Sequence, residues 1–243
     1  MFYNMAGIYR YRVEPQDVDF TQRITLAALG HYILRTAGED ADRSGFGVRE
    51  LNGHNCSWVL SRMAVELERQ PERYEPFDIQ TWVCEYGRLM TTRNFLLLDD
   101  RGECFGAAVT HWAMIDLDSR QPMDLRQLEG AAASLVDREP PIDRPRKVAA
   151  VEADDVVYRR VVYSDIDFNR HVNSMKYLEW MVDRLPLEIL GQHDGVRFDI
   201  NYLHEGKYGQ SLAIACRAEA QEWRFDVKDE AGVSLCRASI RFR

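Results

Sequence analysis

Three polar residues at alternate positions, Asp167, Asn169 and His171, form the group in this sequence that is best suited to chemistry. In an extended segment, alternate side chains project to one face. Histidine exchanges protons near neutral pH, while a carboxylate and a carboxamide can orient an imidazole or polarise a carbonyl group. We therefore expect an active site here. The structural alternative is that Asn169 caps the following helix and that His171 is a satisfied core histidine.

The group precedes a segment with helical spacing, in which Met175, Leu178 and Leu185 recur on one face. The first amides of a helix have no partner within the helix and carry partial positive charge. Amides near residues 172–174 could therefore stabilise an oxyanion that forms on a bound carbonyl group.

The junction between this polar segment and the following helix occurs twice in the chain. Residues 13–25 align with residues 161–173 at an offset of 148, and both copies contain the pattern Asp-Val/Ile-Asp-Phe. At the places equivalent to Asp167, Asn169 and His171, the first copy has Asp19, Thr21 and Arg23. Only the second copy keeps a group that titrates near neutrality, so we expect one active site per chain, built mainly on the second half.

Each junction follows a strand-like stretch and is succeeded by a helical pattern and then by alternating segments. The expected strands are 8–13, 56–67, 77–86, 92–98 and 104–116 in the first copy, and 156–163, 196–202, 211–220, 223–228 and 233–242 in the second. A turn that ends in Gly102 is expected in the first copy, and the corresponding turn in the second copy ends in Gly232. A helix wrapped by a curved antiparallel sheet, twice over, fits this α+β pattern, since neither layer could bury its apolar face alone.

A proline-rich, charged stretch separates the copies. Residues 137–150 contain Pro140, Pro141 and Pro145 among acidic and basic residues, which is typical of an exposed linker. We therefore divide the chain into residues 1–136, a linker over 137–150, and residues 151–243.

The composition excludes several classes of protein. With 31 basic and 39 acidic residues the formal charge is −8, which argues against a nucleic-acid partner or an anionic membrane surface. The sequence contains no run of 18 apolar residues, so no membrane-spanning helix is expected. The first ten residues lack a signal-peptide pattern. Five widely spaced cysteines fit a reducing, cytoplasmic setting. The absence of zinc-ligand spacing and of glycine-rich phosphate motifs predicts neither a metal nor a nucleotide cofactor.

Residues 164–177 resemble the active-site signature of the acyl-acyl carrier protein (acyl-ACP) thioesterase family of plants and bacteria. Further blocks of the first half resemble the family in the same order, at residues 58–69, 81–83, 110–114 and 119–122. The resemblance covers nearly the whole chain. It implies a tandem, or double, hotdog fold with an acyl-binding N-terminal repeat (1–136) and a catalytic C-terminal repeat (151–243).

The resemblance also implies a catalytic set of Asp167, Asn169, His171 and Glu205. Glu205 would act as general base on water, directly or through His171, while Asn169 and His171 orient the thioester and Asp167 supports one of them. By pattern alone, Glu205 would be a solvated strand residue. Many plant members have a cysteine after this glutamate, whereas Gly206 stands here. Direct attack by water is therefore expected, without a covalent acyl-enzyme.

The implied reaction is hydrolysis of the fatty acyl-ACP thioester, which releases a free fatty acid and terminates chain elongation. The implied partner is acyl carrier protein with its phosphopantetheine-linked acyl chain, and the implied assembly is a homodimer. We expect seven apolar residues to line the acyl slot: Leu26, Leu29, Ile33, Trp58, Leu60, Met63 and Met114. Of the 31 basic residues 27 are arginine, and five basic residues are candidates for carrier-protein docking: Arg144, Arg146, Lys147, Arg170 and Lys176.

Three alternatives remain open at this point. A thioesterase for coenzyme A esters would share the fold and the catalytic residues. A hotdog dehydratase also uses a histidine with a carboxylate, but the Asp-x-Asn-x-His block and Glu205 follow the thioesterase pattern. A non-enzymatic acyl-binding or regulatory protein would bind acyl chains without hydrolysing their thioesters.

Overall fold

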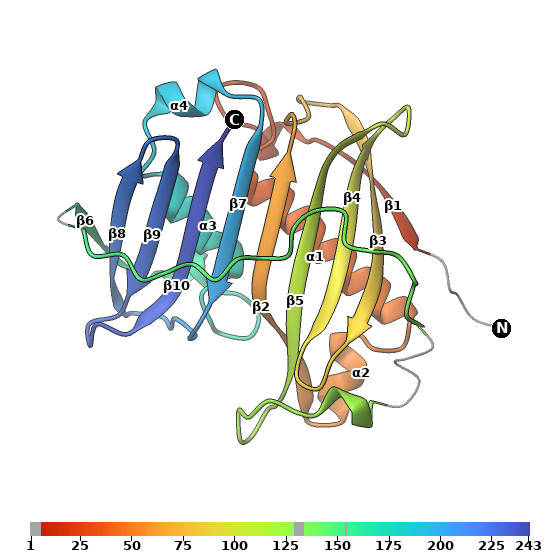
Figure 1. The fold of residues 1–243 in the computed structure, drawn as a ribbon. Helices are drawn as coiled ribbons and strands as arrows, with labels where there is room; N and C mark the ends of the chain where they lie inside the picture. The colour runs from red at the N-terminus through yellow and green to blue at the C-terminus, as the bar shows by residue number, and fades with distance from the viewer. Residues whose placement is uncertain (1–5, 129–133, 154) are drawn as a thin grey trace.

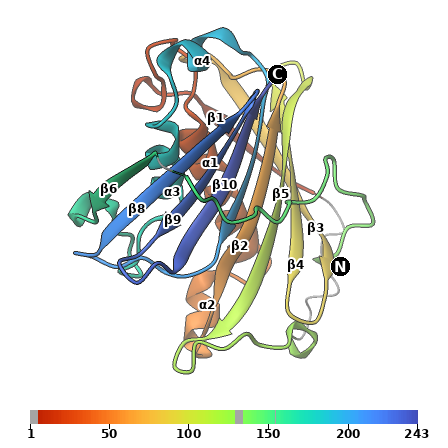
Figure 2. The same ribbon diagram turned by 60° about the vertical axis from the view of Figure 1, so that its left-hand side comes forward.

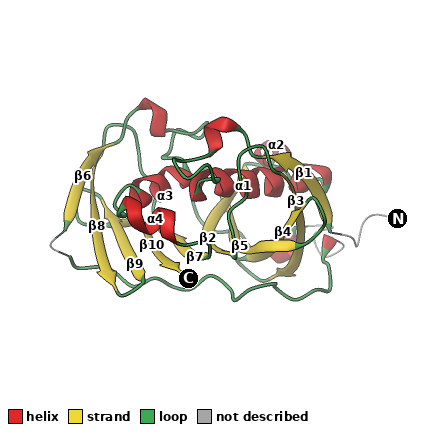
Figure 3. Ribbon diagram, turned by 90° about the horizontal axis from the view of Figure 1, so that it is seen from above, coloured by secondary structure: helices red, strands yellow, loops and turns green. Residues whose placement is uncertain are grey.

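The computed structural model describes residues 6–128, 134–153 and 155–243. These residues form one antiparallel sheet of ten strands in the order β1-β3-β4-β5-β2-β7-β10-β9-β8-β6. Helices α1 and α3 lie side by side against one face of the sheet, which curves around them (Figures 1, 2 and 3). Residues 1–5, where we expected no signal peptide, lie outside the described part of the chain.

The first half contains β1 (Gly7–Arg12), η1 (Pro15–Asp17), α1 (Leu26–Arg43), α2 (Val48–Gly53), β2 (Cys56–Leu67), β3 (Pro76–Tyr86), β4 (Thr91–Asp99), β5 (Cys104–Asp116) and η2 (Leu125–Gln127). The second half contains β6 (Val156–Arg160), η4 (Tyr163–Asp165), α3 (Ser174–Val182), α4 (Leu187–Gln192), β7 (Val196–Tyr202), β8 (Ser211–Glu219), β9 (Glu222–Lys228) and β10 (Ser234–Phe242). The expected strands are confirmed to within one residue at each end, except that β6 stops where η4 approaches. The short helices α2 and α4 were not expected.

The two halves repeat one another down to individual backbone hydrogen bonds. The Thr25 amide donates to the Asp17 carbonyl at 2.8 Å, and the Asn173 amide donates to the Asp165 carbonyl at 2.8 Å. Thr25 and Asn173 then cap α1 and α3 through their side chains. The sheet order is symmetric about the central antiparallel pair β2–β7. The repeat recognised in the sequence is therefore confirmed.

Equivalent hairpin turns join β4 to β5 and β9 to β10. Gly102 has a φ of 81° and Gly232 a φ of 79°, the left-handed region that glycine adopts without steric cost. The side-chain oxygens of Asp99 and Asp229 each accept two amides of their own turn. The two turns predicted from the sequence are thus formed by the same chemistry.

The contact between α1 and α3 depends on a glycine. A Cβ atom at Gly30 would lie 2.2 Å from Sδ of Met175, which is fully buried. The helices therefore approach so closely at this point that no side chain fits without movement of Met175.

Gly30→Ala is expected to destabilise the protein by about 1 kcal/mol, because overpacking a core costs about 1–3 kcal/mol while alanine gains at most about 1 kcal/mol of helix propensity. The melting temperature should fall by about 2–4 °C. Gly38 lies in the same helix with open space beside it, so Gly38→Ala is the matched control and should raise the melting temperature. An equal rise for both variants would contradict the tight contact.

The segment between the halves is exposed over most of its length, as expected for a linker, but it is tied to the sheet. It crosses the face of the sheet opposite α1 and α3 (Figures 1 and 3), and Pro145 and Val148 are buried. The amides of Arg146 and Val148 donate at 2.8 Å to the side chains of Asp199 and Asn201 on β7. The linker backbone thus supplies hydrogen-bond partners to polar side chains that it buries.

Candidate active site

The segment from Asp167 to His171 is a tight turn and not the extended strand end that we expected. Oδ1 of Asp167 accepts the amides of Asn169 at 2.8 Å and of His171 at 3.2 Å, and the Asp167 amide donates to the His171 carbonyl at 2.9 Å. Arg170 has a φ of 66° within this turn. Asp167, Asn169 and His171 nevertheless line the same cavity.

Asp167 stabilises the turn and, within the described residues, forms no hydrogen bond with the His171 imidazole or the Asn169 carboxamide. The first repeat has the same device, because Oδ1 of Asp19 accepts the Thr21 amide at 2.8 Å. An aspartate in both copies is therefore explained by the backbone turn, whereas asparagine and histidine occur only in the second.

Glu205 meets His171 across the loop that follows β7. The Nε2 atom of His171 lies 3.1 Å from Oε2 of Glu205. Two backbone contacts hold the segments together: a β-bridge between His171 and Lys207 and a hydrogen bond from the Val172 amide to the Gly206 carbonyl at 2.9 Å. The fold thus forms an imidazole–carboxylate pair from residues that are far apart in the sequence.

Gly206 is required by close packing. A Cβ atom at this position would lie 2.5 Å from the Tyr177 hydroxyl and 2.9 Å from Cγ2 of Val172. A cysteine would therefore not fit beside Glu205 without displacing the segment that carries His171.

The cysteines of this chain do not contribute to the site. None of the five is among the described residues that line the cavity. Burial raises the pKa of the Cys56, Cys216 and Cys236 thiols above the usual range, which disfavours the thiolate needed for nucleophilic attack.

The start of α3 differs in two respects from what the sequence suggested: the residue that caps the helix, and the backbone amides that are free to donate. The helix is capped by Asn173, whose side chain accepts the Met175 amide at 2.9 Å, and not by Asn169. The amides of Val172 and Asn173 are bonded within the protein. In the described part of the chain, the Ser174 amide and the exposed Asn169 carboxamide have no partner, and both residues line the cavity. Both can donate a hydrogen bond to a bound group.

Arg120 was missed by the sequence reasoning. It lies in the turn after β5 with a φ of 59°, and its guanidinium pairs with Oε1 of Glu205. The residue lies in the block 119–122 that resembles the family, which was the only signal for it in the sequence. The N-terminal half thus contributes a charge to a site otherwise formed by the C-terminal half.

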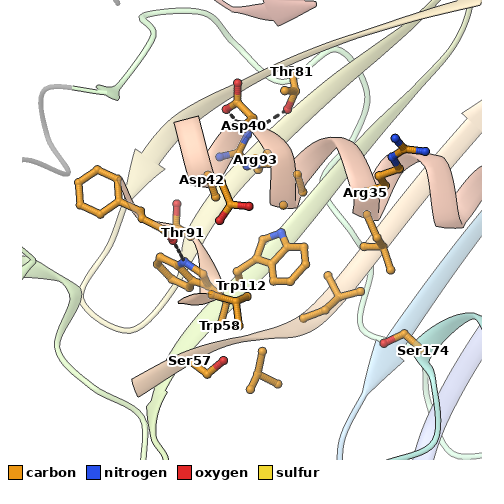
Figure 4. Close-up of a pocket in the computed structure, with 18 of the residues that line it drawn as sticks. Arg35, Asp40, Asp42, Ser57, Trp58, Thr81, Thr91, Arg93, Trp112 and Ser174 are labelled. Carbon is orange, nitrogen blue, oxygen red and sulfur yellow. Dashed lines mark hydrogen bonds and ion pairs between the residues drawn. The ribbon is translucent and has the colours of Figure 1, made fainter. Parts of the chain in front are cut away.

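The cavity has a volume of about 1680 Å³, and His171 and Glu205 are among the residues that line it. It extends between α1 and the strands of the first half (Figure 4). Its apolar walls include Leu34, Phe46, Trp58, Leu60 and Trp112. Of the seven residues expected to line the acyl slot, Trp58 and Leu60 do so. The others are buried in the core and do not line this cavity: Leu26, Leu29, Ile33, Met63 and Met114.

The equivalent place in the first repeat lacks the imidazole–carboxylate pair. The Ile24 amide donates to the Pro71 carbonyl at 2.9 Å, as Val172 does to Gly206, so Gln70 stands where Glu205 stands. Arg23 replaces His171 and pairs with Asp194 at 2.5 Å. A smaller cavity of about 870 Å³ lies there. Residues of both α1 and α3 line it.

The five basic residues do not form one patch, which corrects the expected docking surface. Arg144, Arg146 and Lys147 belong to the linker, on the sheet face opposite the helices (Figure 3). Arg170 and Lys176 lie at the start of α3, on the helix side. Arg144 is moreover paired with Glu85 at 2.8 Å.

Two further observations concern the described residues only. They contain no group of three or more histidine, cysteine or acidic side chains arranged to hold a metal ion. They also contain no helix whose length and apolar character would let it cross a membrane.

The structure consists of two helix-and-sheet repeats, and the second repeat supplies a histidine–carboxylate pair beside the larger cavity. This arrangement defines a double hotdog protein whose two repeats differ at the site. The family model for the acyl-ACP thioesterase N-terminal domain matches residues 8–127, and that for the C-terminal domain matches residues 149–243. The chain therefore belongs to the acyl-ACP thioesterase family. The expected family and the α+β double hotdog fold are confirmed.

Solved and curated relatives agree with this assignment. A crystal structure of an acyl-ACP thioesterase from Bacteroides thetaiotaomicron is 36% identical, covers 98% of both chains and superposes with a TM-score of 0.92. The chloroplastic oleoyl-acyl carrier protein thioesterase of Coriandrum sativum is 24% identical over 88% of this chain and 63% of its own length. The chloroplastic palmitoyl-acyl carrier protein thioesterase of Gossypium hirsutum is 28% identical over 80% of this chain and 51% of its own. The chain thus matches only part of these plant relatives.

Proposed function

We propose that this protein hydrolyses the thioester of fatty acyl-ACP and thereby releases a free fatty acid and terminates chain elongation. The observation that carries the proposal is the His171–Glu205 pair, 3.1 Å apart at one end of an apolar cavity of about 1680 Å³. The cavity accommodates an acyl chain, and the pair can move a proton beside its thioester. Membership of the acyl-ACP thioesterase family supports the same reaction.

In the proposed reaction, water attacks the thioester carbonyl carbon while Glu205 takes its proton, with the imidazole of His171 bonded to the same carboxylate. The oxyanion accepts hydrogen bonds from the Asn169 carboxamide and the Ser174 amide, which have no partner among the described residues. The carbon–sulfur bond then breaks, and the proton passes to the departing thiolate. The products are the fatty acid and the carrier thiol. Asp167 acts as a positioning residue, because its carboxylate fixes the turn.

The two halves have different proposed roles. The N-terminal repeat, residues 1–136, binds the acyl chain, since α1 and its strands supply the walls of the cavity. The C-terminal repeat, residues 151–243, supplies the catalytic residues, and residues 137–150 connect the two. The partner is acyl carrier protein with a phosphopantetheine-linked acyl chain.

A cytoplasmic location and a homodimer also belong to the proposal. The five cysteines are free, which suits a reducing compartment. Fractionation of source cells and light scattering of the purified protein test these two statements. Recovery outside the cytoplasm, or the mass of one chain, would contradict them.

The decisive experiment is a thioesterase assay with acyl-ACPs of increasing chain length, alongside coenzyme A thioesters of the same acyl groups. We expect hydrolysis, with higher kcat/KM on the carrier-protein substrates. Preference for the coenzyme A esters would make the protein an acyl-CoA thioesterase. Tight acyl binding without hydrolysis of any thioester would make it a non-enzymatic acyl-binding protein.

Arg120→Ala is expected to lower kcat/KM by no more than about fivefold, because an exposed ion pair contributes about 0.2–1 kcal/mol. The guanidinium positions the Glu205 carboxylate without touching the substrate. Arg120→Lys keeps the charge and should restore most of the rate. A loss of about a hundredfold or more in steady-state assays would show instead that Arg120 takes part in the chemistry.

A further inference from the structure

The cavity wall has one buried charged section, in the N-terminal half. Nη1 of Arg93 on β4 lies 2.6 Å from Oδ2 of Asp40 on α1 and 3.3 Å from Oγ1 of Thr81 on β3. The Tyr9 hydroxyl on β1 donates to Oδ1 of Asp40 at 3.1 Å. The side chains of Arg93 and Asp40 are only 9% and 19% exposed. All four residues line the cavity, and Figure 4 shows Asp40, Thr81 and Arg93.

The pair borders both the cavity and the packed core. Arg93 shares the inner face of β4 with Phe95 and Leu97, which are fully buried in the main core. Asp40 approaches from the opposite side, because it belongs to α1. The ion pair therefore ties helix to sheet across the cavity, in front of the packed apolar side chains.

The pair is also remote from the catalytic end. Helix α1 contacts α3 at Gly30, beside Met175 and hence beside Ser174 at the start of that helix. Asp40 lies ten residues further along α1, which at 1.5 Å per residue is about 15 Å. An acyl chain whose thioester lies near Ser174 would thus run along α1 toward the ion pair.

We propose that the Asp40–Arg93 ion pair closes the acyl slot and limits the length of the acyl chain that the protein accepts. The inference rests on the proposed function. Each methylene gains free energy only while it exchanges water for apolar contacts. A chain that reaches the pair meets a charged, hydrogen-bonded wall, and it can advance only by breaking a buried ion pair.

The pair is closely packed on the side of β1. Burial, together with the neighbouring Asp40 carboxylate, raises the pKa of Tyr9 to about 12. The β1 backbone also lies close behind, since a Cβ atom on Gly7 would be 2.4 Å from Oδ1 of Asp40. The carboxylate is therefore held between β1 and Arg93.

The test compares kcat/KM across acyl-ACPs of increasing length for the wild type and for Asp40→Ala/Arg93→Ala. The double variant removes both charges together, so no unpaired charge stays buried. We expect its optimum to move to longer chains. A substrate two methylenes longer than the wild-type optimum should gain about 15-fold relative to that optimum, at about fourfold per methylene.

Arg10→Ala/Asp78→Ala is the matched control, because it removes an ion pair between β1 and β3 (3.0 Å) that does not line the cavity. It should leave the length profile unchanged. If Asp40→Ala/Arg93→Ala is folded and active but keeps the wild-type profile, the length limit does not lie at this pair. A wild type that hydrolyses no acyl thioester overturns the proposed function instead.

A labelling experiment on the wild type keeps the inference testable if the double variant fails to fold. Fatty acids of increasing length with a terminal diazirine are bound, photolysed and mapped by mass spectrometry. We expect the longest acid that binds well to label the peptides containing Asp40 or Arg93. Labelling confined to other peptides would overturn the inference.

Discussion

Glu205→Gln is expected to lower kcat for acyl-ACP hydrolysis by about 10²–10⁴-fold, the usual contribution of a general base. Glutamine keeps the size of the side chain and can still contact His171, but it cannot take a proton from water. KM should change little, because the cavity that binds the acyl chain is untouched. Steady-state kinetics on the optimal acyl-ACP measure the effect, and circular dichroism verifies the fold.

Glu188→Gln provides the matched control, since Glu188 lies exposed on α4 and does not line the cavity. The activity of this variant should equal that of the wild type. Because His171 and Glu205 are 3.1 Å apart, they should act as a unit. His171→Gln combined with Glu205→Gln should therefore lose little more than the worse single variant. Near-normal turnover of folded Glu205→Gln would remove Glu205 from the mechanism.

Arg197→Met is expected to destabilise the protein by about 3–5 kcal/mol, because it leaves the buried Asp199 carboxylate without its charged partner. Arg197 on β7 is paired with Asp199 at 3.0 Å and with Glu66 on the adjacent β2 at 3.1 Å. It also donates to the Asp143 carbonyl of the linker at 3.2 Å. The side chains of Arg197 and Asp199 are 4% and 2% exposed. The melting temperature should fall by about 10 °C.

The double variant Arg197→Met/Asp199→Leu removes the neighbouring charge as well and should recover a large part of this loss. Arg35→Met breaks an exposed pair with Glu39 within α1, so it should change stability by less than about 0.5 kcal/mol. If thermal unfolding of Arg197→Met matched that of Arg35→Met, the buried network would not stabilise the junction of the two halves.

The features that could be predicted from the sequence are those that depend on local rules. Alternation of apolar and polar residues placed the strands, since the side-chain period of a strand is two. The hairpin turns followed from an aspartate that binds its own turn and a glycine that adopts a positive φ. The repeated Asp-Val/Ile-Asp-Phe turn marked two equivalent junctions, and its one histidine marked the site. All of these interactions lie within a few residues of one another.

The same local rules failed where distant segments meet. The polar row Arg197, Asp199 and Asn201 has the pattern of a solvent-facing strand surface, yet it is buried, because the linker returns across the sheet and pairs with it. Residues expected to line the acyl slot, such as Leu29 and Ile33, are packed in the core instead. Which apolar residues surround a cavity depends on how the helix and sheet faces meet, and not on hydrophobicity.

The sequence by itself therefore determined the strands, the duplicated helix-and-sheet unit and the position of His171, because backbone preferences and short-range hydrogen bonds fix these features. Local pattern did not place Glu205 beside that histidine; the family resemblance implied it and the tertiary structure shows the contact. The tertiary structure alone decided that Arg120 joins them and that Asp40 and Arg93 meet across the cavity. The reason is physical. Loop closure and strand register bring together residues that share no local pattern, so an acidic side chain looks the same in the sequence whether it lies in water or beside an imidazole.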